Sequence, residues 1–451
     1  MLLLALLASS LTVDGEAALR HASALAALGP HPFGSPRARI AAEYVAVQFR
    51  ASGLGEVRFQ DVESGTAQGA NVIGVLRAPG PEVLMVAAHH DTVPDSPGAR
   101  ASGGSVGVLI EAARALAQRA ERPRTIVFAS LDGREPVLGG RSSLGARAYV
   151  QSLGREARSI VAALVLDRCG RKEGTPVLET PAYADPLRPG ETLVAPAFLV
   201  RAALDGARAA TEPLAVGDPV WSWVYQAGVR TFRITDQGDD RPFAEAGLPA
   251  LRVSDRRFFA ADPSDRGPSD TADRLDALAL ARVGRVLLGA VAVVESASRP
   301  ATPEPDWFGR LGQVVGRGTL LAAGAASLIP ALFVAPRAAG LGFGLRIVHA
   351  TLFSVLLWRQ PVIAAFVFLL PNVLSAFARR WWLVLLGLVP ALSLLLFGIV
   401  AWSRGLVRGV FPAPWELAVA GFVLALTVVR PSQARGKRNR GQPGKKSLPK
   451  R

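Results

Sequence analysis

Runs of apolar residues alternate with amphipathic stretches along the first two thirds of this chain of 451 residues. Most of the runs are continuously apolar, which is typical of strands that are buried on both faces of a sheet. Six of them are expected to be strands, namely NVIGVLR, VLMVAAH, TIVFASL, IVAALVLD, VRTFRIT and PALRVS. Strands that alternate with helices predict an α/β fold whose mostly parallel central sheet is flanked by helices.

Helices are predicted before, between and after these strands. Residues 16–60 are expected to be helical on both sides of a turn-rich stretch, HPFGSPRA, and the helical parts read GEAALRHASALAAL and ARIAAEYVAVQFRASGL. Two more helices are expected over EAARALAQRAE and over the stretch that ends in ARAYV, and residues 276–297 are expected to form a closing helix. Together these elements predict one folded domain over residues 16–297.

The chain changes character after residue 297. Residues 298–318 are expected to be a linker, since SRPATPEPDW holds three prolines. Residues 319–429 are strongly apolar and contain one acidic residue, Glu416. Such a segment predicts an all-α transmembrane region of about five helices, because about 20 apolar residues cross a bilayer. The predicted spans cover residues 319–336, 340–358, 360–378, 381–402 and 412–429.

The net charge of +15 is carried by the apolar and C-terminal parts of the chain. Residues 1–309 have a net charge of −2, residues 310–429 of +8 and residues 430–451 of +9. A nucleic-acid-binding protein would instead carry its basic residues on a folded face or beside aromatic residues. The distribution therefore favours membrane lipid, and not nucleic acid, as a partner.

The charge distribution also predicts a topology. Residues 1–15, MLLLALLASSLTVDG, have a short apolar core and are interpreted as a signal or anchor segment. The basic tail, residues 430–451, is expected to be disordered and cytoplasmic, because cytoplasmic segments are rich in Lys and Arg. With five spans, the folded domain would then lie outside the cytoplasm. Arg404 and Arg408 argue against this topology, since they would lie on the outer side.

Two potential nucleophiles are better explained by packing. Cys169 is the single cysteine, so it has no disulfide partner within the chain, and it is expected to be a small buried residue. GGSVG at residues 103–107 fits the G-x-S-x-G pattern of serine hydrolases, but that motif needs a strand before it and a histidine after it. The preceding residues are not strand-like and the folded domain has no later histidine. The glycines are therefore expected to shape the start of a helix over residues 106–120.

Polar residues follow the ends of several predicted strands. Ligands of α/β proteins bind beyond the carboxyl ends of the strands, so these side chains are expected to converge. A single acid at a strand end means little, but histidine and carboxylates at four strand ends predict a metal site or its remnant. The residues are His89, His90, Asp91, Asp132, Arg134, Glu135, Asp167, Asp236, Asp239 and Asp240.

The motifs around these residues resemble those of the M28 zinc aminopeptidases. The resemblance covers about residues 20–297 in consistent order. It rests on AAHHDTVPDSPGA, VGVLIEAARAL, RTIVFASLDGREPVLGGRSSLGARAYV, VLDRCG, DDRPFAEAGLPALRV and DTADRLDAL. It implies an aminopeptidase-like α/β sandwich that binds two zinc ions and cleaves N-terminal residues from peptides.

Four positions match ligands or supporting groups of that family. The resemblance makes His89 and Asp167 ligands of one zinc ion, with Asp91 as the carboxylate that supports His89. It makes Glu135 a ligand of the second zinc ion. Three positions depart from the family: the bridging aspartate falls on Ala101, the glutamate that serves as general base falls on Arg134, and the last histidine ligand falls on Asp240.

These departures change what the site can do. A pair of zinc ions needs a bridging oxygen ligand, and nitrogen donors help to select zinc. Arg134 stays protonated and cannot accept a proton from water. The sequence therefore predicts a degenerate metal site without a catalytic base, in which zinc is absent or weakly bound.

Arg134 has two alternative placements in such a site. Together with Arg100, it is expected to replace the metal charge by pairing with Glu135, Asp167 or Asp240. In the other placement it points to solvent.

The leading expectation for function is a catalytically inactive, membrane-anchored peptidase-like protein. It would bind or scaffold a peptide or a membrane protein partner. The first alternative is an active metal-dependent aminopeptidase that holds one metal ion through His89 and Asp167. A transporter is a third class, which would require polar residues within the spans, and these are few: Arg346, His349 and Asn372.

Overall fold

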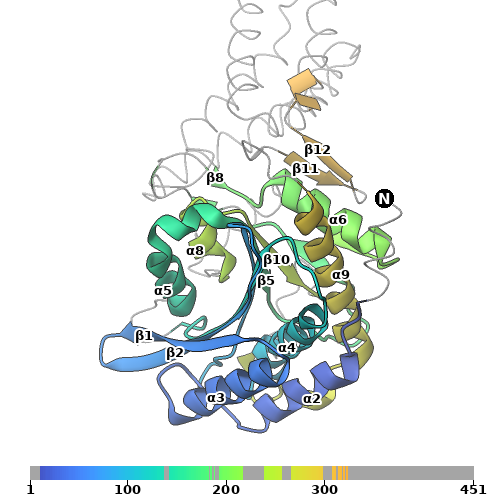
Figure 1. Cartoon of the computed structure of the whole chain (residues 1–451). Coiled ribbons are helices and arrows are strands. Elements are labelled where there is room, and N and C mark those ends of the chain that lie inside the picture. Colours follow the sequence, from blue (N-terminus) through green and yellow to red (C-terminus); the bar gives the residue numbers. More distant parts are fainter. Residues whose placement is uncertain are drawn as a thin grey trace, which may run out of the picture.

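The computed structural model describes residues 11–136, 142–181, 192–216, 238–255 and 266–297, with short stretches at 183–184, 187, 307–310, 313–316, 318–319 and 321–322. A sheet of eight strands runs through these residues in the order β1-β2-β4-β3-β5-β10-β6-β9, with helices on both faces (Figure 1). The strands are β1 (Glu56–Ser64), β2 (Ala67–Leu76), β3 (Val83–His89), β4 (Thr125–Leu131), β5 (Ile160–Leu166), β6 (Val177–Glu179), β9 (Ala215–Val216) and β10 (Ala250–Ser254).

The sheet is mixed, with a parallel centre. Strands β4, β3, β5 and β10 lie side by side and pair in parallel. The pairs β1–β2, β2–β4 and β10–β6 are antiparallel. The predicted α/β sheet flanked by helices is confirmed, and the parallel arrangement holds for its central strands. The antiparallel margin begins with the β1–β2 hairpin, whose turn contains Gly65 at a φ of +61°.

Five of the six predicted strands are present, and the sixth, VRTFRIT, lies outside the described residues. The expectation of helix up to residue 60 was wrong at its end. The helix α3 (Pro36–Ala51) stops before Gly53, whose φ of +88° suits the left-handed turn after a helix. Residues 56–60 belong to β1, which lies at the margin of the sheet.

Helices cover the two faces of the sheet unequally (Figure 1). One face carries α2 (Gly15–Ala26), α3, α4 (Gly104–Ala117), α6 (Ala197–Ala209) and α9 (Ala277–Ser296). The other face carries α5 (Leu144–Leu153) and the short helix α8 (Asp240–Glu245). Short helical turns occur at η1 (Ala99–Gly103), η2 (Gly154–Ser159) and η4 (Ala272–Arg274), and Tyr183–Ala184 (β7) pairs with Thr192–Leu193 (β8).

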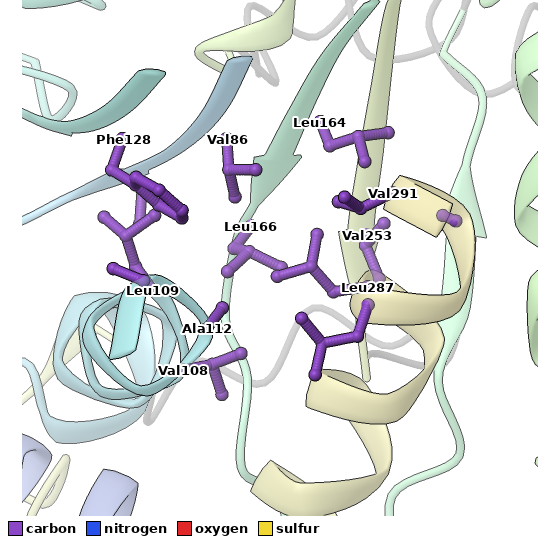
Figure 2. Close-up of a cluster of buried hydrophobic side chains, with 14 of the residues drawn as sticks. Val86, Val108, Leu109, Ala112, Phe128, Leu164, Leu166, Val253, Leu287 and Val291 are labelled. Carbon is purple, nitrogen blue, oxygen red and sulfur yellow. The ribbon is translucent and has the colours of Figure 1, made fainter. Parts of the chain in front are cut away.

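Successive residues of the central strands enter the two hydrophobic cores in turn. In β3, Leu84 and Val86 face the helices α4 and α9, whereas Met85 and Ala87 face the side of α5. Figure 2 shows the first core, in which strand residues such as Val86 pack against side chains of α4 and α9. Burial on both faces explains why these strands are continuously apolar in the sequence.

The helix α9 closes the domain at the predicted place, Ala277–Ser296. Among the described residues it alone is long and apolar enough to cross a membrane, but most of it is buried in the fold against α6, α2 and α4. It is therefore a core helix. The five predicted spans after residue 318 lie almost wholly outside the described residues.

The predicted linker, residues 298–318, contains regular structure that the prolines did not indicate. Strands β11 (Trp307–Arg310) and β12 (Gln313–Gly316) form an antiparallel hairpin within it.

We expect Gly107→Ala to lower the stability of the domain. In a helix this substitution normally stabilises by about 1 kcal/mol, but here a Cβ would lie 2.2 Å from the backbone oxygen of Ala18 on α2. Forcing α2 and α4 apart should cost about 2 kcal/mol, which lowers the melting temperature by several degrees, measurable by circular dichroism of the full chain. Gly55→Ala is the matched control, since nothing lies within 4 Å of its added Cβ. A Gly107→Ala protein as stable as that control would contradict the close helix contact.

Candidate functional site

The parallel strands bring the predicted polar residues together. His89 is the last residue of β3 and pairs in register with Leu131, the last residue of β4. Asp167 follows the end of β5 directly. Strand β3 lies between β4 and β5, and the segment that follows β4 carries Arg134 and Glu135. The convergence that the sequence predicted at this edge of the sheet is present.

Asp91 shapes the segment that follows β4. It is fully buried, and its two carboxylate oxygens accept the backbone N–H groups of Arg134 at 3.0 Å and of Glu135 at 2.9 Å. Burial raises the pKa of Asp91, but the hydrogen bonds from His89 and from these two N–H groups lower it more. Asp91 is thus an anion that supports both the side chain of His89 and the backbone at Arg134, the position of the family's general base.

The side chain of Arg134 is buried within this cluster and does not point to solvent. It is 2% exposed. One guanidinium nitrogen, Nη1, donates to Oε1 of Glu135 at 2.8 Å, and Nη2 donates to Oδ2 of Asp167 at 2.9 Å. One cation therefore joins the two carboxylates that the family resemblance assigns to different metal ions.

Asp167 is held as an anion by its cationic neighbours. Burial raises the pKa of its carboxyl group, but the charges of Arg134, Arg168 and Arg252 and a hydrogen bond from His89 hold that pKa well below its usual range. Asp167 is consequently charged at neutral pH and needs a cation beside it.

His89 has an oxygen acceptor at each ring nitrogen. Its Nδ1 lies 3.1 Å from the carbonyl oxygen of Asp91 and 3.3 Å from that residue's Oδ1. Its Nε2 lies 3.0 Å from the carbonyl oxygen of Ala101 and 3.7 Å from Oδ1 of Asp167. Burial lowers the pKa of His89, but Asp167 and Asp91 outweigh it and raise the pKa to about 10. In this state both nitrogens donate, and neither has a lone pair for a metal ion.

Ala101, at the position of the family's bridging ligand, and its neighbour Arg100 are hydrogen-bonded through their backbone to a different acid, Asp270. Ala101 is buried and offers a methyl group, while its backbone N–H donates to Oδ2 of Asp270 at 3.0 Å. The backbone N–H of Arg100 donates to Oδ1 of the same residue at 2.8 Å. Burial raises the pKa of Asp270 and of Asp255, the latter to about 6, and the charge of Arg100 partly opposes both shifts. The charge of Arg100 thus acts on these two acids.

Asp240 meets a second buried guanidinium, that of Arg252. Arg252 is 0% exposed, and its Nε donates to Oδ1 of Asp240 at 2.9 Å. Its Nη1 donates to Glu179 at 3.1 Å and lies 3.6 Å from Oδ2 of Asp167. Its Nη2 donates to the hydroxyl of Tyr183, which donates to Asp240 in turn. Arg252 therefore stands between Asp240 and Asp167.

The sequence analysis missed Arg252, Glu179 and Tyr183. The available signal was an arginine within the apolar run PALRVS, which predicts a buried charge with a partner. Its partners could not be named from the sequence, because they come from separate elements.

The exposed end of the cluster is an ion pair between Arg266 and Glu135. Nη2 of Arg266 lies 2.9 Å from Oε2 of Glu135, and the Arg266 side chain is 43% exposed. The site is thus a chain in which cations and anions alternate. Its members, in order, are Arg266, Glu135, Arg134, Asp167, Arg252 and Asp240.

The remaining polar residues at the strand ends surround this chain. His90 is buried with Nδ1 2.9 Å from the hydroxyl of Ser130, and burial lowers its pKa to about 3. Asp132 accepts two backbone N–H groups, and burial raises its pKa to about 7. Burial also raises the pKa of Asp239 to about 7. Asp236 lies outside the described residues.

The side chains do not fit a pair of zinc ions in this arrangement. The guanidinium of Arg134 occupies the space between Glu135 and Asp167, and each ring nitrogen of His89 faces a backbone carbonyl oxygen, Nδ1 that of Asp91 and Nε2 that of Ala101. Ala101 offers no bridging oxygen from its side chain. Within the part of the chain that the structure describes, no three His, Cys, Asp or Glu side chains are grouped so that they could hold a metal ion.

The two potential nucleophiles are packing residues. Ser105 lies inside the helix α4 and is fully buried, and its hydroxyl accepts the backbone N–H of Cys169 at 3.3 Å. Burial raises the pKa of the Cys169 thiol well above its ordinary value. No strand precedes Ser105, because residues 99–103 form the helical turn η1. The α4 helix extends from residue 104 to 117, close to the predicted 106–120.

Solved structures share this fold at low sequence identity. BSAP, a zinc aminopeptidase from Bacillus subtilis, aligns over 62% of this chain and 95% of its own, with a TM-score of 0.50 and 16% identity. The glutaminyl cyclase of Porphyromonas gingivalis aligns over 62% and 98%, with a TM-score of 0.50 and 18% identity. The LapA aminopeptidase of Legionella pneumophila aligns over 63% and 73%, with a TM-score of 0.50 and 16% identity.

No curated protein matches the chain. One family model does match, and its range covers the strands from β3 to β10 and the polar residues described above. Residues 71–291 match peptidase family M28, and this part of the chain is a peptidase M28 family domain.

Proposed function

We propose that this chain is a membrane-anchored, M28 peptidase-like protein that does not hydrolyse peptides and has a binding or scaffolding role. The observation that carries the proposal is the buried guanidinium of Arg134 at the position of the general base. It pairs with Glu135 and Asp167, which the family resemblance makes metal ligands.

Hydrolysis by a metallopeptidase needs a base and an activated water molecule. The base must take a proton in the transition state, and guanidinium cannot do so near neutral pH. The metal ions of such enzymes lower the pKa of a bound water molecule. A cation that already occupies the space between the two carboxylates opposes metal binding there, so both requirements are unmet.

The alternative is an aminopeptidase that works with one metal ion. It would require Arg134 to leave both Glu135 and Asp167, and His89 to give up a proton. Separating a buried ion pair costs about 3–5 kcal/mol. The metal would have to supply that free energy before any catalysis began, which makes the inactive protein the better proposal.

The proposed location and partners follow from charge. We propose that residues 16–297 lie outside the cytoplasm and that about five spans within residues 319–429 anchor them. Nine basic residues among residues 430–451 would attract anionic lipid head groups at about 1 kcal/mol per residue. Besides lipid, the proposed partners are a peptide or another membrane protein, and not nucleic acid.

We expect the purified full chain to release no chromophore from aminoacyl-chromophore substrates, with or without added zinc. Arg134→Glu should be inactive as well, since Ala101 still offers no bridging oxygen. The same substitution places a third carboxylate beside Glu135 and Asp167, so it should also destabilise the domain by about 3–5 kcal/mol. Bacillus subtilis BSAP serves as the positive control of the assay. Turnover by the unmodified chain would refute the proposed inactivity, and turnover by Arg134→Glu would refute the role given to Ala101.

We expect the full chain to hold less than about one zinc ion per molecule, measured by elemental analysis after purification in zinc-containing buffer. Dialysis against a chelator should leave its melting temperature unchanged, because Arg134 and not a metal ion neutralises Glu135 and Asp167. Two tightly bound zinc ions, or a melting temperature that falls on chelation, would contradict the proposal.

We expect a fusion of alkaline phosphatase after residue 300 to be active and the same fusion after residue 451 to be inactive. The enzyme is active only outside the cytoplasm, and the basic tail resists export. The reverse pattern would overturn the proposed topology. Equal activity of the two fusions would mean that the number of spans is even.

A further inference from the structure

We propose that the short connection after β12 holds the α6 side of the domain on the head groups of the membrane. An exposed stripe of this helix, formed by Arg201, Asp205 and Arg208, would then contact lipid phosphate. The proposal goes beyond the proposed function but rests on one part of it, the membrane span that is predicted to begin at residue 319. It adds a lipid-binding surface on the folded domain to the one on the basic tail.

The hairpin of β11 and β12 connects the domain to the predicted first span. Strand β12 packs against α6, and Figure 1 shows both strands of the hairpin beside this helix. Strand β12 ends at Gly316, and the described residues 318–319 and 321–322 are already helical. The chain therefore passes within three residues from a strand that touches α6 to the start of the predicted span.

The length of this connection limits how far α6 can lie from the bilayer. Three residues span at most about 11 Å when they are fully extended. The head-group layer between hydrocarbon and water is about 5–8 Å thick on each side of a bilayer. The end of β12 consequently lies within a few ångströms of the head groups, and α6 lies beside it.

The helix α6 is held firmly by the core, so the limit applies to the whole domain. The helices α6 and α9 touch through their backbones, since a Cβ added to Gly206 would lie 2.2 Å from the carbonyl carbon of Gly289. At the end of α9, the guanidinium of Arg124 donates to the backbone oxygens of Val294 and Ala297. These bonds fix the place at which the chain leaves the domain.

The outer face of α6 has the chemistry that lipid head groups require. Arg201, Asp205 and Arg208 are exposed and lie four and three positions apart, which places them on one face of the helix. Nη1 of Arg208 donates to Oδ1 of Asp205 at 2.6 Å, and the two side chains remain 59% and 52% exposed. Guanidinium donors match the oxygen atoms of a phosphate group. Two arginines beside one acid also favour anionic lipid.

The helix α3 lies far from this surface and provides the control. It contacts β1 and β2, whereas α6 contacts β10. Five strand spacings separate β1 from β10 in the sheet, which is about 24 Å. The helix α3 carries an exposed ion pair of the same kind, in which Nε of Arg39 lies 3.7 Å from Oε1 of Glu43. A label in place of Arg39 should therefore stay away from lipid.

Fluorescence quenching by lipid tests the orientation. Arg208→Cys and Arg39→Cys are each labelled with a fluorophore in the full chain, in which Cys169 is 0% exposed and should not react. The chains are reconstituted in vesicles of phosphatidylcholine and phosphatidylglycerol whose head groups carry a nitroxide quencher in both leaflets. The label at residue 208 should lose most of its fluorescence, whereas the label at residue 39 should keep most of it.

A longer connection tests whether the short one holds the domain in place. An insertion of about 20 Gly and Ser residues after Gly316 spans about 25 Å on average. The label at residue 208 should then regain much of its fluorescence, because a basic residue near an anionic surface contributes only about 1 kcal/mol. Unchanged quenching after the insertion would contradict the role given to the short connection.

Two results would overturn the inference and leave the membrane anchor standing. They are equal quenching at residues 39 and 208, and no quenching at residue 208 in a chain that stays in the vesicles after an alkaline wash. A chain that the wash removes would refute the membrane anchor itself, and the inference with it. If Arg208→Cys gives no folded protein, Arg201→Cys replaces it and is judged by the same criteria.

Discussion

The contact between the Arg134 guanidinium and the Asp167 carboxylate is the interaction on which the rest of the site depends. It joins the segment after β4 to the end of β5, two neighbours of β3, and both side chains are buried. A charge pair in such a place gains little net stability over apolar packing, but removal of either partner leaves a costly buried charge. The other charged groups of the cluster must therefore be arranged so that the charges of Arg134 and Asp167 stay compensated.

The balance extends well beyond one pair. Arg252 repeats the pattern of Arg134, since it also lies among acids from separate elements, β6 and α8. The two guanidinium groups share Asp167, and the alternation of charges runs from the half-exposed Arg266 to the buried Asp240. A chain of this kind fixes the contacts among the side chains at the carboxyl ends of the parallel strands.

The sequence predicted the parts of this arrangement that depend on local pattern. Continuous apolar runs identified the central strands, and their ends placed Arg134 near Glu135 and Asp167. The antiparallel margin was not predictable in the same way. Strand β1 is largely exposed, and its many polar residues obscure the alternation of apolar and polar positions that would indicate a strand. Arg252 was read as part of an apolar strand. Its contacts with Glu179 and Tyr183 join residues that are 73 and 69 positions away, and no local pattern encodes such pairs.

A fold that gathers acids at the ends of parallel strands must also supply cations there. A metal ion can neutralise these carboxylates, and it can also bind and activate water. A guanidinium meets the same need with a charge that stays protonated and with two fixed donors, and it activates nothing. The two solutions call for nearly the same carboxylates, so retained acids alone do not distinguish an active centre from a structural one. The distinguishing residue is the one that brings the cation, and in this chain it is Arg134, which is covalently part of the protein and cannot dissociate.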